Sequence, residues 1–105
     1  MRFGHVEYQR KDKRGILTEG VRQRSEQVNI LEIKKGHTFG GHYHKERTEF
    51  FLVIKGALEL NGKEMLNEYD WVTIEPGDRH SFFAYKPTIA LELLSEPYDE
   101  KDTWK

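Results

Sequence analysis

The chain has 105 residues, enough for one domain with a single modest core but too few for two lobes around a cleft. Its 17 basic and 18 acidic residues nearly cancel, so no charge attracts it to nucleic acid or an anionic membrane, and a small-molecule partner is expected instead. Cysteine is absent, which excludes disulfides and thiolate chemistry, so any metal would be held by nitrogen and oxygen atoms.

The first part of the chain is polar. Residues 1–5 do not open a signal-peptide pattern, and no apolar run approaches the length that crosses a bilayer. We therefore expect a soluble, cytoplasmic protein that does not insert into a membrane. The polar residues before about position 28 are expected to form an edge strand or an arm.

Short apolar segments separated by turn signals make up most of the remaining chain. Six of them are rich in β-branched and aromatic residues and are predicted to be strands: residues 28–33, 48–54, 57–60, 71–74, 80–85 and 89–94. None has a helical period, so the chain is predicted to be all-β. Asn61-Gly62 predicts a two-residue hairpin, since both turn positions need positive φ.

The segment 50–54 is apolar on both of its alternating faces. A strand with one face in water would alternate apolar and polar residues, so both faces of this one are expected to be covered. The cover is either another part of the chain or a second subunit, and we expect an isologous homodimer. The charged residues 45–47 and 98–102 are interpreted as a solvated hairpin tip and a solvated tail.

Four side chains form a candidate metal site. His42 and His44 are two residues apart, so on a strand their imidazoles would point to the same face. Glu49 begins the next apolar strand, and His80 leaves a turn directly onto another. Three imidazoles and one carboxylate suit one divalent transition-metal ion such as Zn, Mn, Fe or Ni, and suit Ca or Mg poorly because those ions prefer oxygen ligands.

The spacing of these residues resembles the first signature motif of the cupin superfamily. Gly36, His42, His44, Glu49 and Gly56 match that motif at every fixed position. The resemblance implies a double-stranded β-helix, or jelly-roll barrel, with the metal inside it.

The second cupin motif is matched more loosely. Gly77 and His80 keep their places, but proline occurs at Pro76, one residue late, and Tyr69 and Ala84 replace the terminal glycine and asparagine. All four ligand positions remain. The resemblance implies a single cupin domain over residues 1–105, with the barrel core at about 28–94 and a short polar tail after it.

The flanks carry a narrower resemblance. Residues 12–19, 27–29, 95–99 and 102–104 resemble the cupin domains of bacterial capsular-sugar enzymes. Those domains act on nucleotide-linked deoxy-keto sugars as epimerases or isomerases. The resemblance thus implies a carbohydrate substrate.

Two classes of function remain open. One is a metal-dependent isomerase or epimerase that forms a metal-stabilised enolate, with a cupin dioxygenase loaded with Fe(II) as its rival. Tyr85, Glu92 and His37 are candidate catalytic bases by residue type alone. The other class is a non-catalytic cupin that binds a metal or a carbohydrate.

Overall fold

The computed structural model describes residues 1–21 and 23–105. The elements are β1 (Arg2–His5), β2 (Gln9–Asp12), β3 (Gly15–Thr18), β4 (Gln27–Ile33), β5 (Thr38–His42), β6 (Glu49–Lys55), β7 (Leu58–Leu60), β8 (Glu64–Leu66), β9 (Asp70–Ile74), β10 (His80–Ala84), β11 (Thr88–Leu94) and the 3-10 turn η1 (Glu100–Asp102). Within the described residues, no helix is long and apolar enough to span a membrane.

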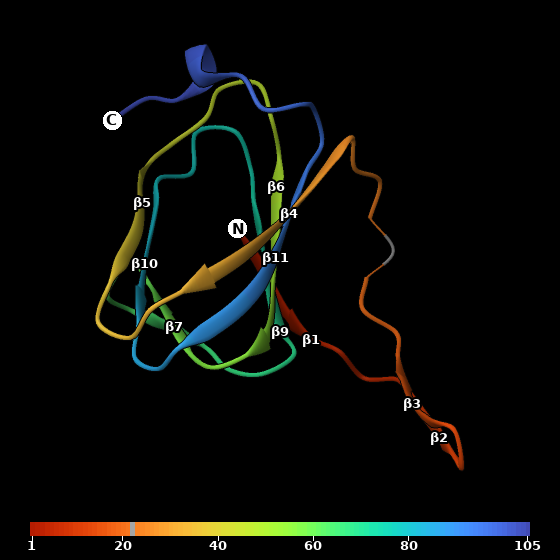
Figure 1. Cartoon of the computed structure of the whole chain (residues 1–105). Helices are drawn as coiled ribbons and strands as arrows, with labels where there is room; N and C mark the ends of the chain where they lie inside the picture. The colour runs from red at the N-terminus through yellow and green to blue at the C-terminus, as the bar shows by residue number, and fades with distance from the viewer. Residues whose placement is uncertain (22) are drawn as a thin grey trace.

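Two antiparallel sheets face each other across the core (Figure 1). The larger has the strand order β1-β9-β6-β11-β4, and the smaller has the order β5-β10-β7-β8. Buried side chains from both sheets fill the space between them: Phe51, Val53, Leu58, Leu60, Leu66, Val72, Ile74, Phe82, Ala84 and Ala90. The all-β jelly-roll prediction is therefore confirmed.

All six expected strands occur, and each end lies within one residue of its predicted position. The hairpin prediction is also correct, since Asn61 and Gly62 have φ values of 54° and 66° and Lys63 donates its N–H to the Leu60 carbonyl at 3.0 Å. Strand β5 is not among the predicted strands because it contains Gly40-Gly41, a pair that favours turns.

The outward face of β6 is partly covered by the chain itself. Phe50 and Leu52 are buried there and cluster with Val6 and with Trp71 of β9. The same outer face at β11 and β4 is not covered, since Ile30 is 71% exposed and Val28 is 55% exposed. The large sheet therefore carries an apolar surface beside a covered one.

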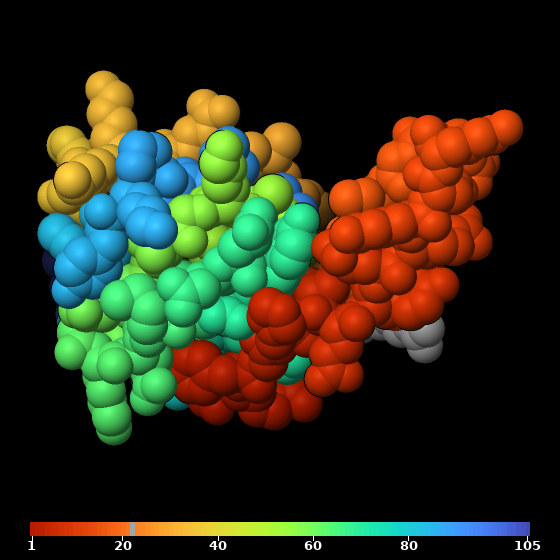
Figure 2. Space-filling model, turned by 90° about the horizontal axis from the view of Figure 1, so that it is seen from below, coloured from red at the N-terminus to blue at the C-terminus, as the bar shows by residue number. Residues whose placement is uncertain are grey.

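The polar beginning of the chain forms both an edge strand and an arm. Strand β1 pairs with β9 at the edge of the large sheet, whereas β2 and β3 pair only with each other. Their hairpin projects from the body of the barrel (Figure 2), which gives the molecule extents of 47 × 30 × 21 Å. Tyr8, Ile16 and Leu17 are exposed on or beside this hairpin.

Candidate metal centre

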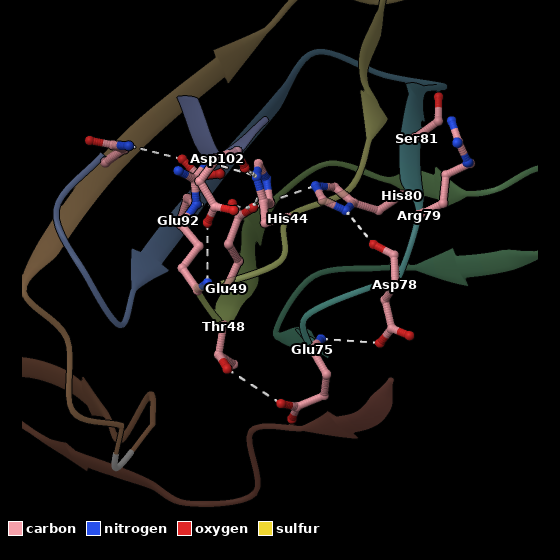
Figure 3. A network of polar contacts seen from close by, with 12 residues as sticks. His44, Thr48, Glu49, Glu75, Asp78, Arg79, His80, Ser81, Glu92 and Asp102 are labelled. Atoms are coloured by element: carbon pink, nitrogen blue, oxygen red, sulfur yellow. Dashed lines mark hydrogen bonds and ion pairs between the residues drawn. The ribbon is translucent and has the colours of Figure 1, made fainter. Parts of the chain in front are cut away.

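The structure brings the four predicted ligands together at one end of the barrel. His42 ends β5, His44 follows two residues later, and Glu49 and His80 begin β6 and β10. One ligand atom from each residue can be chosen so that all four lie within 4.8 Å of one another. Figure 3 shows the side chains of His44, Glu49 and His80 converging. Metal binding itself stays a prediction.

Local backbone geometry explains how His42 and His80 come to face each other. They are cross-strand partners between β5 and β10, and the register shifts just after them, so that Ser81 pairs with Gly40. Gly40 has φ of +97°, and a Cβ atom there would lie 2.8 Å from the His80 carbonyl oxygen. Only glycine permits this close approach, and the bulge directs both imidazoles into the barrel.

Backbone carbonyl groups fix the tautomers of two histidines. His44 Nδ1 donates to the Asp102 carbonyl oxygen at 2.6 Å, and His80 Nδ1 donates to the Asp78 carbonyl oxygen at 3.1 Å. A carbonyl can only accept, so each Nδ1 carries the proton and each Nε2 keeps a lone pair. The His80 lone pair is thus free for a metal ion, whereas the His44 lone pair faces Arg47 Nη2 at 3.2 Å.

The imidazoles are held neutral by their surroundings. The pKa of His80 is lowered to about 4, mainly by burial. The hydrogen bond to the Asp78 carbonyl raises this pKa, and the neighbouring His42 and His44 lower it. Burial also lowers the pKa values of His42 and His44. Neutral imidazole is the form that binds metals, so the three histidines have the protonation state that coordination needs at neutral pH.

Glu49 is the buried carboxyl of the cluster. Its pKa is raised to about 9, first by burial and then by the adjacent Glu92 carboxyl, while Arg47 opposes the shift. Its Oε1 atom contacts His44 Nε2, which has no proton. Two acceptors in contact require a proton or a cation between them.

Buried atoms without hydrogen-bond partners gather at this site. Within the described part of the chain they include both Glu49 carboxyl oxygens, His80 Nε2, and Arg47 Nε and Nη1. Such atoms are costly to bury unless a ligand satisfies them. The Glu49 oxygens and His80 Nε2 carry lone pairs, and ligands of these types fit a divalent transition metal.

Arg47 is part of the site, so the expectation of a solvated hairpin tip is wrong for this residue. Its side chain is only 4% exposed. Its Nη2 lies 3.2 Å from His44 Nε2, and its Nε lies 3.6 Å from Glu49 Oε1. Because His44 Nε2 has one lone pair, it cannot accept from Arg47 and bind a metal at the same time. Metal binding would therefore require the guanidinium to move from that nitrogen.

Only one of the three candidate bases lies at the site. Glu92 is 8% exposed, lies beside Glu49, and accepts from Asn29 Nδ2 at 2.9 Å (Figure 3). Tyr85 is 45% exposed and donates to Glu59 at 2.7 Å instead.

His37 is exposed and precedes β5, at the opposite end of that strand from His42, where its main-chain carbonyl accepts from the N–H of Ala84 at 3.0 Å. The structure does not bring Tyr85 or His37 to the cluster, and residue type alone gave no position along the barrel axis.

The expected solvated tail is also wrong where it reaches Asp102, which is buried. Burial tends to raise the pKa of Asp102, but backbone N–H groups of Lys45, Glu46 and Arg47 more than offset this and lower it.

The model of the polysaccharide biosynthesis C-terminal domain family matches residues 10–91. The chain belongs to this family. A UDP-2-acetamido-2,6-beta-L-arabino-hexul-4-ose reductase from Pseudomonas aeruginosa is 39% identical over 56 residues, which cover 52% of this chain and 15% of the reductase. An uncharacterized protein from Aquifex aeolicus is 36% identical over 66 residues, covering 59% of this chain and 54% of that protein. This family member thus spans only part of the length of either relative.

Solved structures share the fold of this family member. A double mutant of the QdtA 3,4-ketoisomerase from Thermoanaerobacterium thermosaccharolyticum, in complex with TDP, has a TM-score of 0.78 and 26% identity, covering 97% of this chain and 84% of that one. The dTDP-4-dehydrorhamnose 3,5-epimerase from Sulfolobus tokodaii has a TM-score of 0.78 and 22% identity. The match covers 93% of this chain and 72% of the epimerase chain. These similarities place the chain in the cupin-type jelly-roll fold.

Proposed function

We propose that the chain is an epimerase or isomerase of nucleotide-linked keto sugars. The observation that carries this proposal is the cluster of four potential ligand atoms within 4.8 Å of one another at one end of the barrel, three of them from buried residues. Support comes from similar structures that are named as a sugar ketoisomerase and a sugar epimerase, and from a partial relative named as a UDP-hexulose reductase.

We also propose that His42, His44, Glu49 and His80 hold one divalent transition-metal ion. The buried Glu49 oxygens and His80 Nε2, which have no hydrogen-bond partner among the described residues, support this, because a bound cation would satisfy them. When bound, such an ion would polarise a substrate carbonyl and offset the negative charge that develops as the adjacent proton leaves.

Glu92 is the proposed proton acceptor. Its carboxyl group lies inside the barrel next to Glu49, where a bound sugar would place the carbon beside its carbonyl group. The proton would pass from that carbon to Glu92. In an isomerisation Glu92 would return it to a neighbouring carbon, whereas an epimerisation would take a proton from water on the opposite face of the same carbon and leave the first proton on Glu92. The rings of Phe51 and Phe82 lie 6.0 and 6.2 Å from the His80 ring and help to exclude water.

Product analysis tests this function. Protein stripped with a chelator and reloaded with Zn or Mn is incubated with UDP-linked and dTDP-linked 4-keto-6-deoxy sugars, and products are identified by proton NMR. We expect turnover by the loaded protein and its loss in Glu49→Gln and Glu92→Gln. Tyr85→Phe serves as the control, since Tyr85 is exposed and remote from the cluster.

Other outcomes would identify the alternatives. Oxygen consumption by Fe(II)-loaded protein, without sugar conversion, would replace the proposal with a dioxygenase. A thermal shift with sugar nucleotide but no product across the panel would replace it with a binding protein.

A homodimer is the proposed assembly. The apolar outer face of β4 and β11 is open at Val28, Ile30 and Ile89, and the projecting hairpin exposes further apolar side chains. An isolated two-stranded hairpin is marginally stable in water, so contact with a second copy would stabilise it. Light scattering should report a dimer for the wild type and a monomer for Ile30→Lys, and a wild-type monomer would refute this assembly.

A further inference from the structure

The segment that follows β11 returns across the metal-site end of the barrel. Figure 1 shows η1 lying above the ends of β5 and β6. Tyr43 and Trp104 exchange two backbone hydrogen bonds, of 2.8 and 2.9 Å, in an isolated β-bridge. Lys45 Nζ also lies 3.8 Å from the centre of the Trp104 ring. The segment is thus attached at Tyr43, between His42 and His44, and at Lys45, directly after His44.

The Asp102 carboxylate caps the loop between two candidate ligands. Its Oδ1 accepts from the N–H of Lys45 at 2.9 Å and of Glu46 at 3.2 Å, and its Oδ2 accepts from the N–H of Arg47 at 3.3 Å. These three residues lead from His44 toward Glu49. A single buried carboxylate therefore holds the backbone that spaces those two ligands.

The main chain of the same residue holds the His44 ring. The Asp102 carbonyl oxygen accepts from His44 Nδ1 at 2.6 Å, which keeps the proton on Nδ1 and the lone pair of Nε2 directed into the cluster. Asp102 is 8% exposed, so water does not readily replace these contacts. The ring orientation and the loop conformation thus depend on one residue that is distant in sequence.

We propose that Asp102 is a positioning residue that sets the metal affinity of the site by fixing the orientation and tautomer of His44. This inference rests on the proposed metal site, and it extends that site to a residue that touches no metal. Outer partners of metal-bound histidines commonly change affinity by about 10- to 100-fold when they are lost. Asp102 is expected to act in that range.

The test compares Asp102→Ala and Asp102→Asn with Asp99→Ala as the matched control. Asp99 caps the same 3-10 turn through a 2.9 Å bond from Lys101 N–H but is exposed. Competition titration with Zn or Co should give a dissociation constant raised about 10- to 100-fold in Asp102→Ala. Asp102→Asn keeps one acceptor oxygen and should be affected less, and Asp99→Ala should match the wild type.

A second measurement needs no metal. Nitrogen NMR of His44 in chelator should show the Nδ1–H tautomer in the wild type and in Asp99→Ala. Asp102→Ala keeps the main-chain carbonyl group but loses the side-chain bonds that hold its segment against the 45–47 loop, so it should show a mixture of tautomers. Urea unfolding of the metal-free proteins identifies any variant that does not fold. If Asp102→Ala does not fold, the affinity and tautomer of Asp102→Asn decide whether Asp102 positions His44.

The outcomes separate this inference from the proposed function. A wild type that binds no metal would refute the metal site, while the tautomer measurement still judges the positioning role. A wild type that binds metal, with unchanged affinity and tautomer in Asp102→Ala, would refute the positioning role and leave the metal site intact. Equal losses in Asp99→Ala and Asp102→Ala would assign the effect to the whole segment and refute the role of Asp102.

Discussion

Acidification of the metal-free protein should destabilise it through His80. This imidazole is fully buried, and burial lowers its pKa from 6.5 to about 4 in the folded chain. Between those two values the unfolded chain binds a proton that the folded chain does not. The free energy of unfolding is therefore unaffected by His80 protonation above pH 6.5, and it falls as the pH drops from 6.5 toward 4.

The size of this effect follows from the two pKa values. Each pKa unit corresponds to about 1.4 kcal/mol, so a fall from 6.5 to about 4 corresponds to roughly 3 kcal/mol of unfolding free energy. Small domains commonly have only about 5 to 15 kcal/mol in total. The loss should thus be plain in urea unfolding.

The assay is urea unfolding in chelator at several pH values between 7 and 4. The wild type is compared with His80→Gln, which has no titrating ring, and with His37→Gln as an exposed control. The wild-type advantage over His80→Gln should shrink by about 3 kcal/mol from pH 7 to 4, whereas His37→Gln should follow the wild type. Parallel curves for the wild type and His80→Gln would refute the reasoning.

Two further substitutions test the packing around the site and the barrel. Arg47→Met removes the guanidinium that competes for His44 Nε2, so titration should show tighter Zn binding than in the wild type, and equal or weaker binding would contradict that competition. Gly56→Ala would place a Cβ atom 2.7 Å from the Pro87 carbonyl oxygen at φ of +109°, whereas Gly15→Ala at φ of +142° meets no atom within 4 Å. Thermal or urea unfolding should show Gly56→Ala to be the more destabilising by about 2 kcal/mol or more, and equal losses would show that the barrel yields at this turn.

The strands and the four clustered residues could be predicted because local patterns specify them. Short segments rich in β-branched and aromatic residues, bounded by turn signals, placed the strand ends to within one residue, and positive φ at Asn61 and Gly62 followed from residue type. The spacing of His42 and His44 matched a known motif. Strand β5 was not predicted, because a glycine pair favours a turn in sequence, whereas Gly40 here permits the close approach to His80.

The surroundings of the site could not be predicted because they depend on long-range contacts. Asp102 meets the 45–47 loop across more than 50 positions of sequence. Arg47 resembles its charged neighbours in sequence, and only the fold shows that its side chain turns inward. Tyr85 and Glu92 were equal candidates by chemistry, and the strand register alone separates them.

Proton exchange in deuterated water tests the central claim most directly, namely that this end of the barrel moves a proton beside a sugar carbonyl. The metal-loaded wild type should introduce deuterium at the carbon next to the carbonyl of a UDP- or dTDP-linked 4-keto-6-deoxy sugar. Glu92→Gln should lose this exchange while it keeps a full equivalent of metal, because Glu92 is the proposed proton acceptor and lies outside the four-residue cluster. Absence of deuterium with every such substrate, in protein shown to be folded and fully loaded, would contradict the claim.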